Sequence, residues 1–375
     1  MTDIMRAGIL TFHNAHNYGA VLQAYALREA IRSLGISCDI INYRNDAIEA
    51  QYGIELKHRE LYLTKNLKLI IDNVLWNLDI KNMTPSWQLQ FHSFECFINN
   101  ILLENHSFKY SLLDVSHSHY DALIVGSDQI WNGNLTGGYD PVYFLDFDYD
   151  GRKIAYGAST SLGSVKEQDR SFFKRCLDDF DSISVREKEL ANDLQKSLGI
   201  DATTVIDPSF LLDVRDYENL IYKGRLHKTP YIFVYYVIED AELRKFSKRV
   251  SEKLGCEILE LHYYKRFWMK DDNQIADIGP DKFLWYIKNA EAVCTNSFHG
   301  VVFSILYRKK FFTTAHGNVR INNLLSLAEP YLDVSPLRDE RTIFLQLNKK
   351  SYKTSTFVEK ERKKSFSFLK RALFE

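Results

Sequence analysis

Residues 291–308 read EAVCTNSFHGVVFSILYR, and this stretch decides the fold. The apolar run at 292–295 predicts a buried strand, and the apolar run at 301–307 predicts a helix. Only a short turn at 296–300 joins them, so the strand passes almost directly into the helix. A strand that turns at once into a helix is typical of α/β proteins with parallel sheets.

The turn itself carries polar side chains and a histidine, and reads Thr295-Asn296-Ser297-Phe298-His299-Gly300. The crevice beyond the ends of parallel strands is open to ligands, and the first turn of the next helix offers unpaired N–H groups to an anion. His299 is therefore a candidate for proton transfer beside a bound anion. The alternative is a histidine that points inward and bonds to a backbone carbonyl.

The same alternation continues around this turn. Apolar runs predict strands at 231–238, 257–262 and 310–314, and helices at 239–254, 280–289 and 319–327. Pro280 suits the first turn of its helix, where a missing N–H costs nothing. Arg320 lies at the start of the last of these helices, which makes it a candidate for binding an anion.

The N-terminal part of the chain repeats the pattern. A strand at 7–12 leads through a polar turn at 13–19 into a helix with apolar residues at three- and four-residue intervals. The turn lacks the G-x-G-x-x-G pattern of dinucleotide-binding folds. Further strands are predicted at 37–43, 122–125, 154–158, 183–185 and 204–206.

We therefore expect an α/β protein with two Rossmann-like domains that face a central cleft. Asp207 precedes a proline and begins a crossing segment, so the N-terminal domain is expected over 1–215 and the C-terminal domain over 216–345. A helical insertion is expected at about 46–118, either as a lid over the cleft or packed on the outside. The segment 346–375 is expected to be helical, and its basic amphipathic pattern favours a solvated surface helix.

Polar residues follow three of the N-terminal strands. Asp128 follows a glycine turn and is either a helix cap or a general base. Ser159 belongs to a cluster of hydroxyls that either binds an anion or a sugar hydroxyl, or only forms a loop. Arg186 either holds a carboxylate or phosphate in bidentate fashion, or pairs with Glu187 or Glu189.

Composition excludes several classes of protein. The net charge is −1, so nothing indicates a nucleic-acid partner. The five cysteines are widely spaced without a Cys-x-x-Cys pair, which supports neither a disulfide framework nor a zinc site. The N-terminus does not resemble a signal peptide, and no apolar run approaches the ~20 residues needed to span a bilayer. A cytoplasmic protein is expected.

Four segments resemble the polysaccharide pyruvyl transferase family, and their order and spacing cover the chain from about 6 to 327. They are TF at 11–12 with NYGAVLQAYAL at 17–27, GSDQIWN at 126–132, SVRE at 184–187 with DP at 207–208, and TNSFHG at 295–300. The insertion at 46–118 and the last forty residues are not covered by the resemblance.

The resemblance implies a fold like that of two-domain GT-B glycosyltransferases. It also implies transfer of pyruvate from phosphoenolpyruvate onto a sugar, as a ketal that bridges two hydroxyls. The acceptor would belong to a cell-surface glycan or its precursor, such as a lipid-linked oligosaccharide reached by peripheral contact with the inner membrane face. Neither a metal nor an organic cofactor is implied, and phosphoenolpyruvate serves as co-substrate.

The resemblance also implies roles for single residues. His299 corresponds to the catalytic histidine, Asp128 to an acidic residue of the cleft, and Arg186 to a donor-binding arginine. The donor is further expected to contact Ser297, Gly300 and Arg320, and the acceptor to contact Asn17, Gly19, Gln129 and Ser159.

The chain departs from the family at one place. Some members carry a basic residue just before the histidine, where this chain has Ser297 and Phe298. The donor phosphate is therefore expected to find its cation in Arg186 or Arg320. Two rival functions share the same cleft: a GT-B glycosyltransferase that uses a nucleotide sugar, and a non-catalytic glycan-binding relative.

Overall fold

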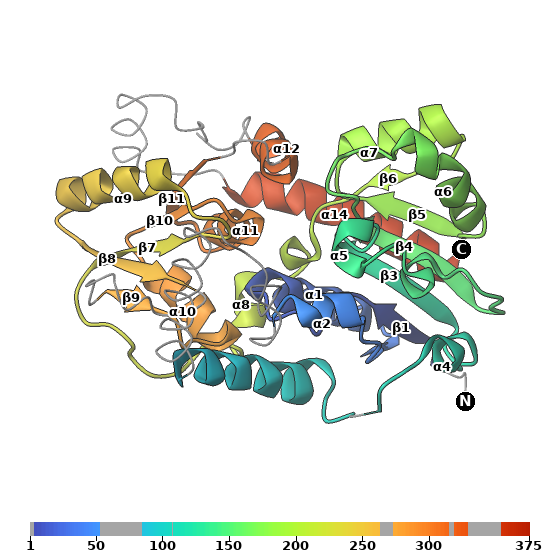
Figure 1. Ribbon diagram of the computed structural model, residues 1–375, viewed down its shortest axis with the longest axis horizontal. Coiled ribbons are helices and arrows are strands. Elements are labelled where there is room, and N and C mark those ends of the chain that lie inside the picture. The colour runs from blue at the N-terminus through green and yellow to red at the C-terminus, as the bar shows by residue number, and fades with distance from the viewer. Residues whose placement is uncertain (1–3, 53–84, 107, 263–272, 315–318, 329–353) are drawn as a thin grey trace, which may run out of the picture.

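The computed structural model describes residues 4–52, 85–106, 108–262, 273–314, 319–328 and 354–375. These residues form two parallel β-sheets, each with helices packed against it (Figure 1). The first sheet has the order β2-β1-β3-β4-β5-β6 and the second the order β11-β10-β7-β8-β9. The predicted class of two α/β domains is therefore confirmed.

The strands are short and their interiors are buried. Those of the first sheet are β1 (Arg6–Leu10), β2 (Ser37–Ile40), β3 (Ala122–Asp128), β4 (Arg152–Ala158), β5 (Ser182–Val185) and β6 (Thr203–Thr204). Those of the second are β7 (Tyr231–Tyr235), β8 (Glu257–Leu261), β9 (Gln274–Ile275), β10 (Ala292–Thr295) and β11 (Lys310–Thr313). Helices cover both faces, so the strands read as apolar runs without alternation.

Long helices connect these strands and flank the cleft. The principal ones are α1 (Tyr18–Arg32), α9 (Ala241–Leu254), α10 (Pro280–Asn289), α11 (Phe298–Leu306), α12 (Val319–Ala328) and α14 (Thr354–Phe374). Helix α1 of the first domain contacts both α10 and α11 of the second. A single apolar cluster therefore includes residues from both domains, among them Ile9 and Leu22 with Phe283 and Phe303.

Shorter helical elements complete the first domain and its link to the second. They are α2 (Asp46–Ala50), α4 (Leu112–Ser116), α5 (Gly133–Thr136), α6 (Arg170–Leu177), α7 (Lys188–Asp193) and α8 (Val214–Tyr217), with a helix at 85–97. The 3-10 and π segments are η2 (Ile98–Leu102), η3 (Pro141–Phe144), η4 (Glu167–Asp169), η5 (Leu194–Leu198) and η6 (Pro208–Phe210).

The insertion expected at 46–118 is only partly described, and the helical spacing at 61–78 lies outside the described residues. The helix at 85–97 packs against the start of α1, because Gln90 donates to the Tyr18 hydroxyl at 3.0 Å and Glu95 pairs with His16 at 3.0 Å. Its side chains do not line the cleft, which favours the reading of outside packing for this part. In contrast, α2 and the residues after it do reach the cleft.

Helix α14 corrects the expectation of a solvated surface helix. It crosses back to the first domain and lies beside β4, with Phe368, Leu369 and Leu373 buried (Figure 1). Ile206 donates its N–H to the Ser365 hydroxyl at 3.0 Å, and Arg362 donates to the carbonyl of Phe210 at 2.7 Å. The other basic residues of the helix, Lys360, Lys363, Lys364, Lys370 and Arg371, are exposed.

Several element boundaries near the cleft differ from those predicted: the strands expected at 7–12 and 231–238 end at Leu10 and Tyr235, and two further differences concern site residues. Strand β3 continues to Asp128 instead of ending at 125, and α11 begins at Phe298 instead of at 301. Both differences shorten the turns, so Asp128 and His299 lie on regular elements and not in loops. None of the described helices has the length and apolar character needed to cross a bilayer.

Candidate functional site

A cavity of about 560 Å³ lies between the two sheets. The first domain lines it with residues that follow β1 and β3, including Asn17 and Gln129, and the second with residues that follow β7 and β10, including Glu239 and Ser297. In each sheet these two strands are neighbours. The strand that follows one of them in the chain lies on the opposite side from the strand that follows the other. Ligands of open α/β sheets bind at such switch points, and here two of them face each other.

The first turn of α11 forms part of the wall. Ser297 is the N-cap, and its hydroxyl accepts the N–H of Gly300 at 3.2 Å. The N–H groups of Phe298 and His299 have no partner in the preceding turn, because a helix begins with unpaired donors. Gly300 packs against Thr295, and a Cβ at this position would overlap with the threonine side chain. The sequence therefore builds a tight, positively polarised helix start at the cavity.

His299 lines the cavity with one ring nitrogen turned away from it. Its Nε2 lies 3.5 Å from a carboxylate oxygen of Asp207, at ion-pair distance. Its imidazole also packs against Gly19 of α1, where a Cβ would overlap with the ring. The expectation of a histidine that is bonded to a backbone carbonyl is not met, because the group opposite Nε2 is a carboxylate.

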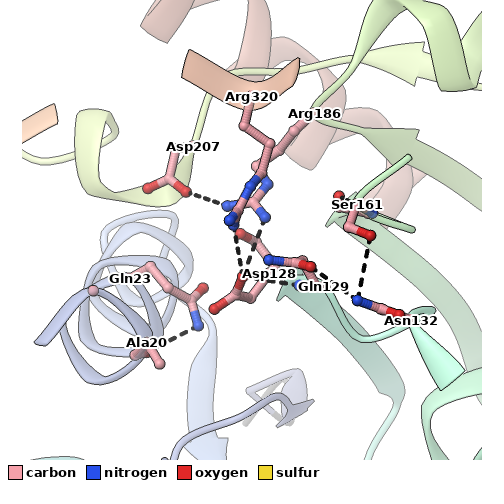
Figure 2. A network of polar contacts seen from close by, with 12 residues as sticks. Ala20, Gln23, Asp128, Gln129, Asn132, Ser161, Arg186, Asp207 and Arg320 are labelled. Atoms are coloured by element: carbon pink, nitrogen blue, oxygen red, sulfur yellow. Dashed lines mark hydrogen bonds and ion pairs between the residues drawn. The ribbon is translucent and has the colours of Figure 1, made fainter. Parts of the chain in front are cut away.

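Figure 2 shows a network of two arginines and two aspartates, Arg186, Arg320, Asp128 and Asp207, which His299 joins through Asp207. Arg186 donates to Asp207 at 2.9 Å and to Asp128 at 3.2 Å. Arg320 reaches Asp128 at 3.5 Å from α12 of the other domain. With the amide of Gln129 turned so that its oxygen faces Arg320, that oxygen accepts two bonds from the guanidinium, at 2.9 and 2.8 Å.

Phe298 explains how the site manages without a basic residue just before the histidine. The guanidinium of Arg186 lies 5.3 Å from the centre of the Phe298 ring, and that of Arg320 lies 5.6 Å from it. Cations are attracted to the face of an aromatic ring. Phe298 therefore gathers two arginines from elsewhere in the chain around the start of α11.

The network shifts the pKa values of its members. Burial alone would raise the pKa of Asp128, but Arg186 and Arg320 outweigh it and lower that pKa. Burial would likewise raise the pKa of Asp207, yet His299 and Arg186 hold it well below its usual range. Both carboxylates are thus ionised at neutral pH. Burial, and then repulsion from Arg186, lowers the pKa of Arg320.

The structure places six of the ten predicted site residues on the cavity wall: Asn17, Asp128, Gln129, Ser297, His299 and Arg320. The other four, Gly19, Ser159, Arg186 and Gly300, lie behind it. Of these, Gly19 and Gly300 allow close packing, as described above. Asn17 lines the wall but also caps α1, because its side-chain oxygen accepts the N–H of Gly19 at 2.9 Å.

Arg186 and Ser159 do not line the cavity, in contrast to the predicted direct contacts with a ligand. Arg186 is buried and donates to two carboxylates, so its placement favours a supporting role over the predicted contact with the donor. Ser159 donates to Glu187 at 2.8 Å and accepts the N–H of Ser161 at 3.2 Å. Burial raises the pKa of Glu187 despite the nearby Arg186. Ser159 thus fixes the loop beside the cavity and does not face it.

The sequence did not point to the roles of Asp207 and Asn296. Asp207 was predicted only to begin a crossing segment, yet its buried carboxylate lies between Arg186 and His299. Asn296 accepts the N–H of Val237 at 2.8 Å and donates to the carbonyl of Ile238 at 2.6 Å, which holds the loop after β7 at the cavity mouth. For Asp207, the available signal was that Asp207-Pro208 belongs to the same family segment as Arg186.

Comparison with known proteins gives a family and a fold. A family model described as polysaccharide pyruvyl transferase matches residues 17–318. No curated protein matches the chain at a significant level.

Similar solved structures include UDP-GlcNAc 2-epimerases. The enzyme of Methanocaldococcus jannaschii, in complex with UDP-GlcNAc and UDP, is 13% identical, with a TM-score of 0.52 over 98% of this chain and 100% of that one. The enzyme of Neisseria meningitidis, bound to UDP-GlcNAc, is 10% identical, with a TM-score of 0.51 over 99% of each chain. At such identities the likeness shows the fold alone, which is of the GT-B type, as predicted.

Proposed function

The chain belongs to the polysaccharide pyruvyl transferase family, and from this premise we propose that it transfers pyruvate from phosphoenolpyruvate onto a cell-surface polysaccharide or its precursor. The product is a ketal that bridges two hydroxyls of one sugar. The observation that carries the proposal is the position of His299, which lines the cavity in the first turn of α11 beside Arg320. An anionic substrate would find a cation in Arg320 and a proton donor in His299 at this place.

The donor would bind at the start of α11. Phosphoenolpyruvate carries a carboxylate and a phosphate, which both need N–H donors and cations. The first turn of α11 supplies backbone N–H groups, and Arg320 supplies a guanidinium on the cavity wall. Arg320 is better placed than Arg186 for this contact, since Arg186 is enclosed by Asp128, Asp207 and Phe298.

The chemistry follows from the donor's enol phosphate. His299 would give a proton to the methylene carbon C3, which becomes a methyl group, and C2 acquires oxocarbenium character. A sugar hydroxyl attacks C2, the bond from C2 to the phosphate oxygen breaks, and a second hydroxyl of the same sugar attacks C2. Of the two hydroxyl protons released, one restores the proton that His299 gave, and the other leaves with phosphate.

Asp128 fits the role of a fixed negative charge better than that of a general base. Its pKa is lowered, so it holds protons poorly at neutral pH. Its carboxylate keeps Arg186 and Arg320 in place, at 3.2 and 3.5 Å. It would therefore orient the donor's cation and face the acceptor, while a hydroxyl proton passes to the leaving phosphate or back to His299.

The acceptor would occupy the rest of the cavity. Its wall there combines polar groups with apolar side chains, namely Asn17, Gln129, Gln51, Phe12, Ile48 and Leu135. Such a surface suits a sugar, which has hydroxyls at its edge and an apolar face. All five cysteines are free, which agrees with a reducing compartment, and we place the reaction in the cytoplasm.

Purified protein tests the proposal through donor binding and phosphate release. Phosphoenolpyruvate should raise the melting temperature, and UDP- or GDP-sugars should not. With an extract of lipid-linked glycans as acceptor, phosphate should appear together with a glycan heavier by pyruvate less one water. His299→Asn should slow phosphate release by about a hundredfold or more, whereas the exposed control His117→Asn should not.

Two results would contradict this function. Stabilisation by a nucleotide sugar but not by phosphoenolpyruvate would point to a glycosyltransferase. Binding of a glycan without any turnover of phosphoenolpyruvate would point to a non-catalytic relative. Wild-type rates in His299→Asn would remove the assigned proton donor.

A further inference from the structure

We propose that Asp207 is the positioning residue of His299: its carboxylate holds the imidazole through Nε2 and leaves Nδ1 as the nitrogen that faces the donor. This inference rests on the proposed function, because it assigns a direction to the proton that His299 gives. Asp207 lies in the first domain, 92 positions before His299 (299 − 207 = 92), and its side chain is 1% exposed.

The two oxygens of Asp207 serve different purposes. Oδ1 accepts the N–H of Ser209 at 2.9 Å and so caps η6. Oδ2 accepts from Arg186 at 2.9 Å and lies 3.5 Å from Nε2 of His299. The capping bond fixes the carboxylate plane through Oδ1, which leaves Oδ2 aimed at the charged groups. One residue thus combines a structural bond with an orienting contact.

The surroundings of the imidazole leave one nitrogen for a ligand. Nε2 is buried and, within the described part of the chain, makes no hydrogen bond that would compete with the Asp207 carboxylate. On the other side, Gly19 packs closely against the ring, and a Cβ there would overlap with Nδ1. Only a glycine therefore lets the imidazole lie in this place. His299 lines the cavity and its Nε2 is buried, so we assign Nδ1 as the nitrogen that meets the donor carbon.

Charge decides where the proton lies in this pair. The charged groups around His299 are Asp207 and Asp128, with Arg186 and Arg320 behind them. His299 and then Arg186 hold the pKa of Asp207 well below its usual range, so the carboxylate that faces Nε2 is ionised. An ionised carboxylate can only accept a hydrogen bond, so Nε2 is the ring nitrogen that carries a proton toward it.

The chain contains a matched control. Asp140 also precedes a proline, is 8% exposed, and caps η3 through the N–H of Val142 at 2.9 Å. Its second oxygen accepts from Tyr43 at 2.8 Å and from Asn45 at 2.7 Å, not from a histidine. Asp140→Asn therefore removes the same kind of capping carboxylate without touching His299.

Histidine NMR tests the inference without an acceptor. In protein labelled with ¹⁵N-histidine, the His299 signals are assigned as those absent from His299→Asn. In the neutral ring, the wild type should carry its proton on Nε2. In Asp207→Asn, which removes the charge that holds this proton, the neutral ring should move toward the form protonated on Nδ1. Asp140→Asn should leave the position of the proton unchanged.

The result that overturns the inference is equally concrete. A wild-type neutral ring with its proton on Nδ1 would exclude the assigned orientation, and this needs no Asp207 variant, so a poorly folded Asp207→Asn cannot hide it. An unchanged position of the proton in a folded Asp207→Asn, checked by circular dichroism, would also overturn the inference. Asp207→Glu, which keeps the charge, should keep the proton on Nε2.

Kinetics separate this inference from the proposed function. Asp207→Asn should lower kcat by about tenfold or more, with little change in binding of phosphoenolpyruvate. If His299→Asn is inactive while Asp207→Asn keeps the wild-type kcat, only the role of Asp207 fails. If His299→Asn stays active, the proposed function fails, whatever the NMR result.

Discussion

At the scale of the residue, Phe298 shows how a site can replace one cation by others. Its ring contacts the guanidinium groups of Arg186 and Arg320, which come from two different domains. Arg186 forms ion pairs with Asp128 and Asp207, which neutralise its charge within the network. Among the described residues, the carboxylate contact of Arg320 is the longer one to Asp128, at 3.5 Å, and its bonds to Gln129 are to a neutral amide. The charge that a donor meets is therefore mainly that of Arg320.

Replacing Arg320 by glutamine should weaken donor binding strongly and turnover less. A charge-assisted hydrogen bond is worth roughly 1.5–3 kcal/mol, so KM for phosphoenolpyruvate should rise by about ten- to a hundredfold. Steady-state rates of phosphate release at several phosphoenolpyruvate concentrations measure this KM. Arg175→Gln, which breaks only an exposed pair with Asp146, is the control and should keep the wild-type KM. An unchanged KM in Arg320→Gln would remove this residue from the donor site.

Gly19 offers a test of close packing at His299. A Cβ in Gly19→Ala would overlap with the imidazole and push it from its place. We expect phosphate release to fall by about a hundredfold, as a displaced catalytic group often does, while alanine in a helix should not lower the melting temperature much. Gly133→Ala, at the start of the short helix α5, is the control. Wild-type activity in Gly19→Ala would mean that His299 tolerates displacement.

At the scale of the element, the strands and helices were largely predictable, because they are apolar runs between polar turns. The predicted helix 280–289 and strand 292–295 match α10 and β10 residue for residue. The predicted start of α11, at 301, was too late. Ser297 caps the helix, so Phe298, His299 and Gly300 of the polar turn already belong to its first turn. The partners of Asp207 could not be predicted, because they are far apart in sequence and meet only through the packing of two domains.

Helix α14 provides a prediction at this scale. Its amphipathic pattern predicted a surface helix, and only the structure shows that its apolar face belongs to the core of the first domain. Leu369 is fully buried, so Leu369→Ala should lower the free energy of unfolding by about 3 kcal/mol. Urea denaturation measures this, with the exposed Lys370→Ala as control. A loss no greater than that of the control would show that α14 is not part of the core.

At the scale of the whole molecule, stability should depend on a histidine outside the site. His13 is fully buried, and burial lowers its pKa from 6.5 to about 4, although the Asn42 side-chain oxygen and the Thr11 carbonyl, both acceptors at 3.2 Å from its ring nitrogens, act to raise it. Between these pH values the unfolded chain binds a proton that the folded chain does not. The free energy of unfolding should therefore fall by up to about 3 kcal/mol as the pH drops from 6.5 to 4.

Chemical denaturation at several pH values tests this linkage. His13→Gln removes the titrating group and should flatten the dependence between pH 6.5 and 4 relative to the wild type. The comparison between the two proteins matters, because carboxylates also titrate in this range. Parallel curves for the two proteins would show that His13 is not the group responsible.

The whole molecule places its chemistry where two sheets face each other at their switch points. Helix α1 of one domain contacts α11 of the other, so Gly19 and Asp207 of the first domain jointly hold His299 of the second. The architecture was predictable from alternating strands and helices. The separate roles of Arg186 and Arg320 within the site were not predictable, because they depend on which charges neutralise each other after folding.

The most direct test of the account is a crystal of the protein soaked with phospholactate, a saturated and unreactive analogue of phosphoenolpyruvate. The account predicts its phosphate and carboxylate at the first turn of α11 beside Arg320, with its C3 next to Nδ1 of His299. Electron density for the analogue elsewhere in the protein would contradict the account. So would an empty site in this soak that a parallel soak with a nucleotide sugar fills.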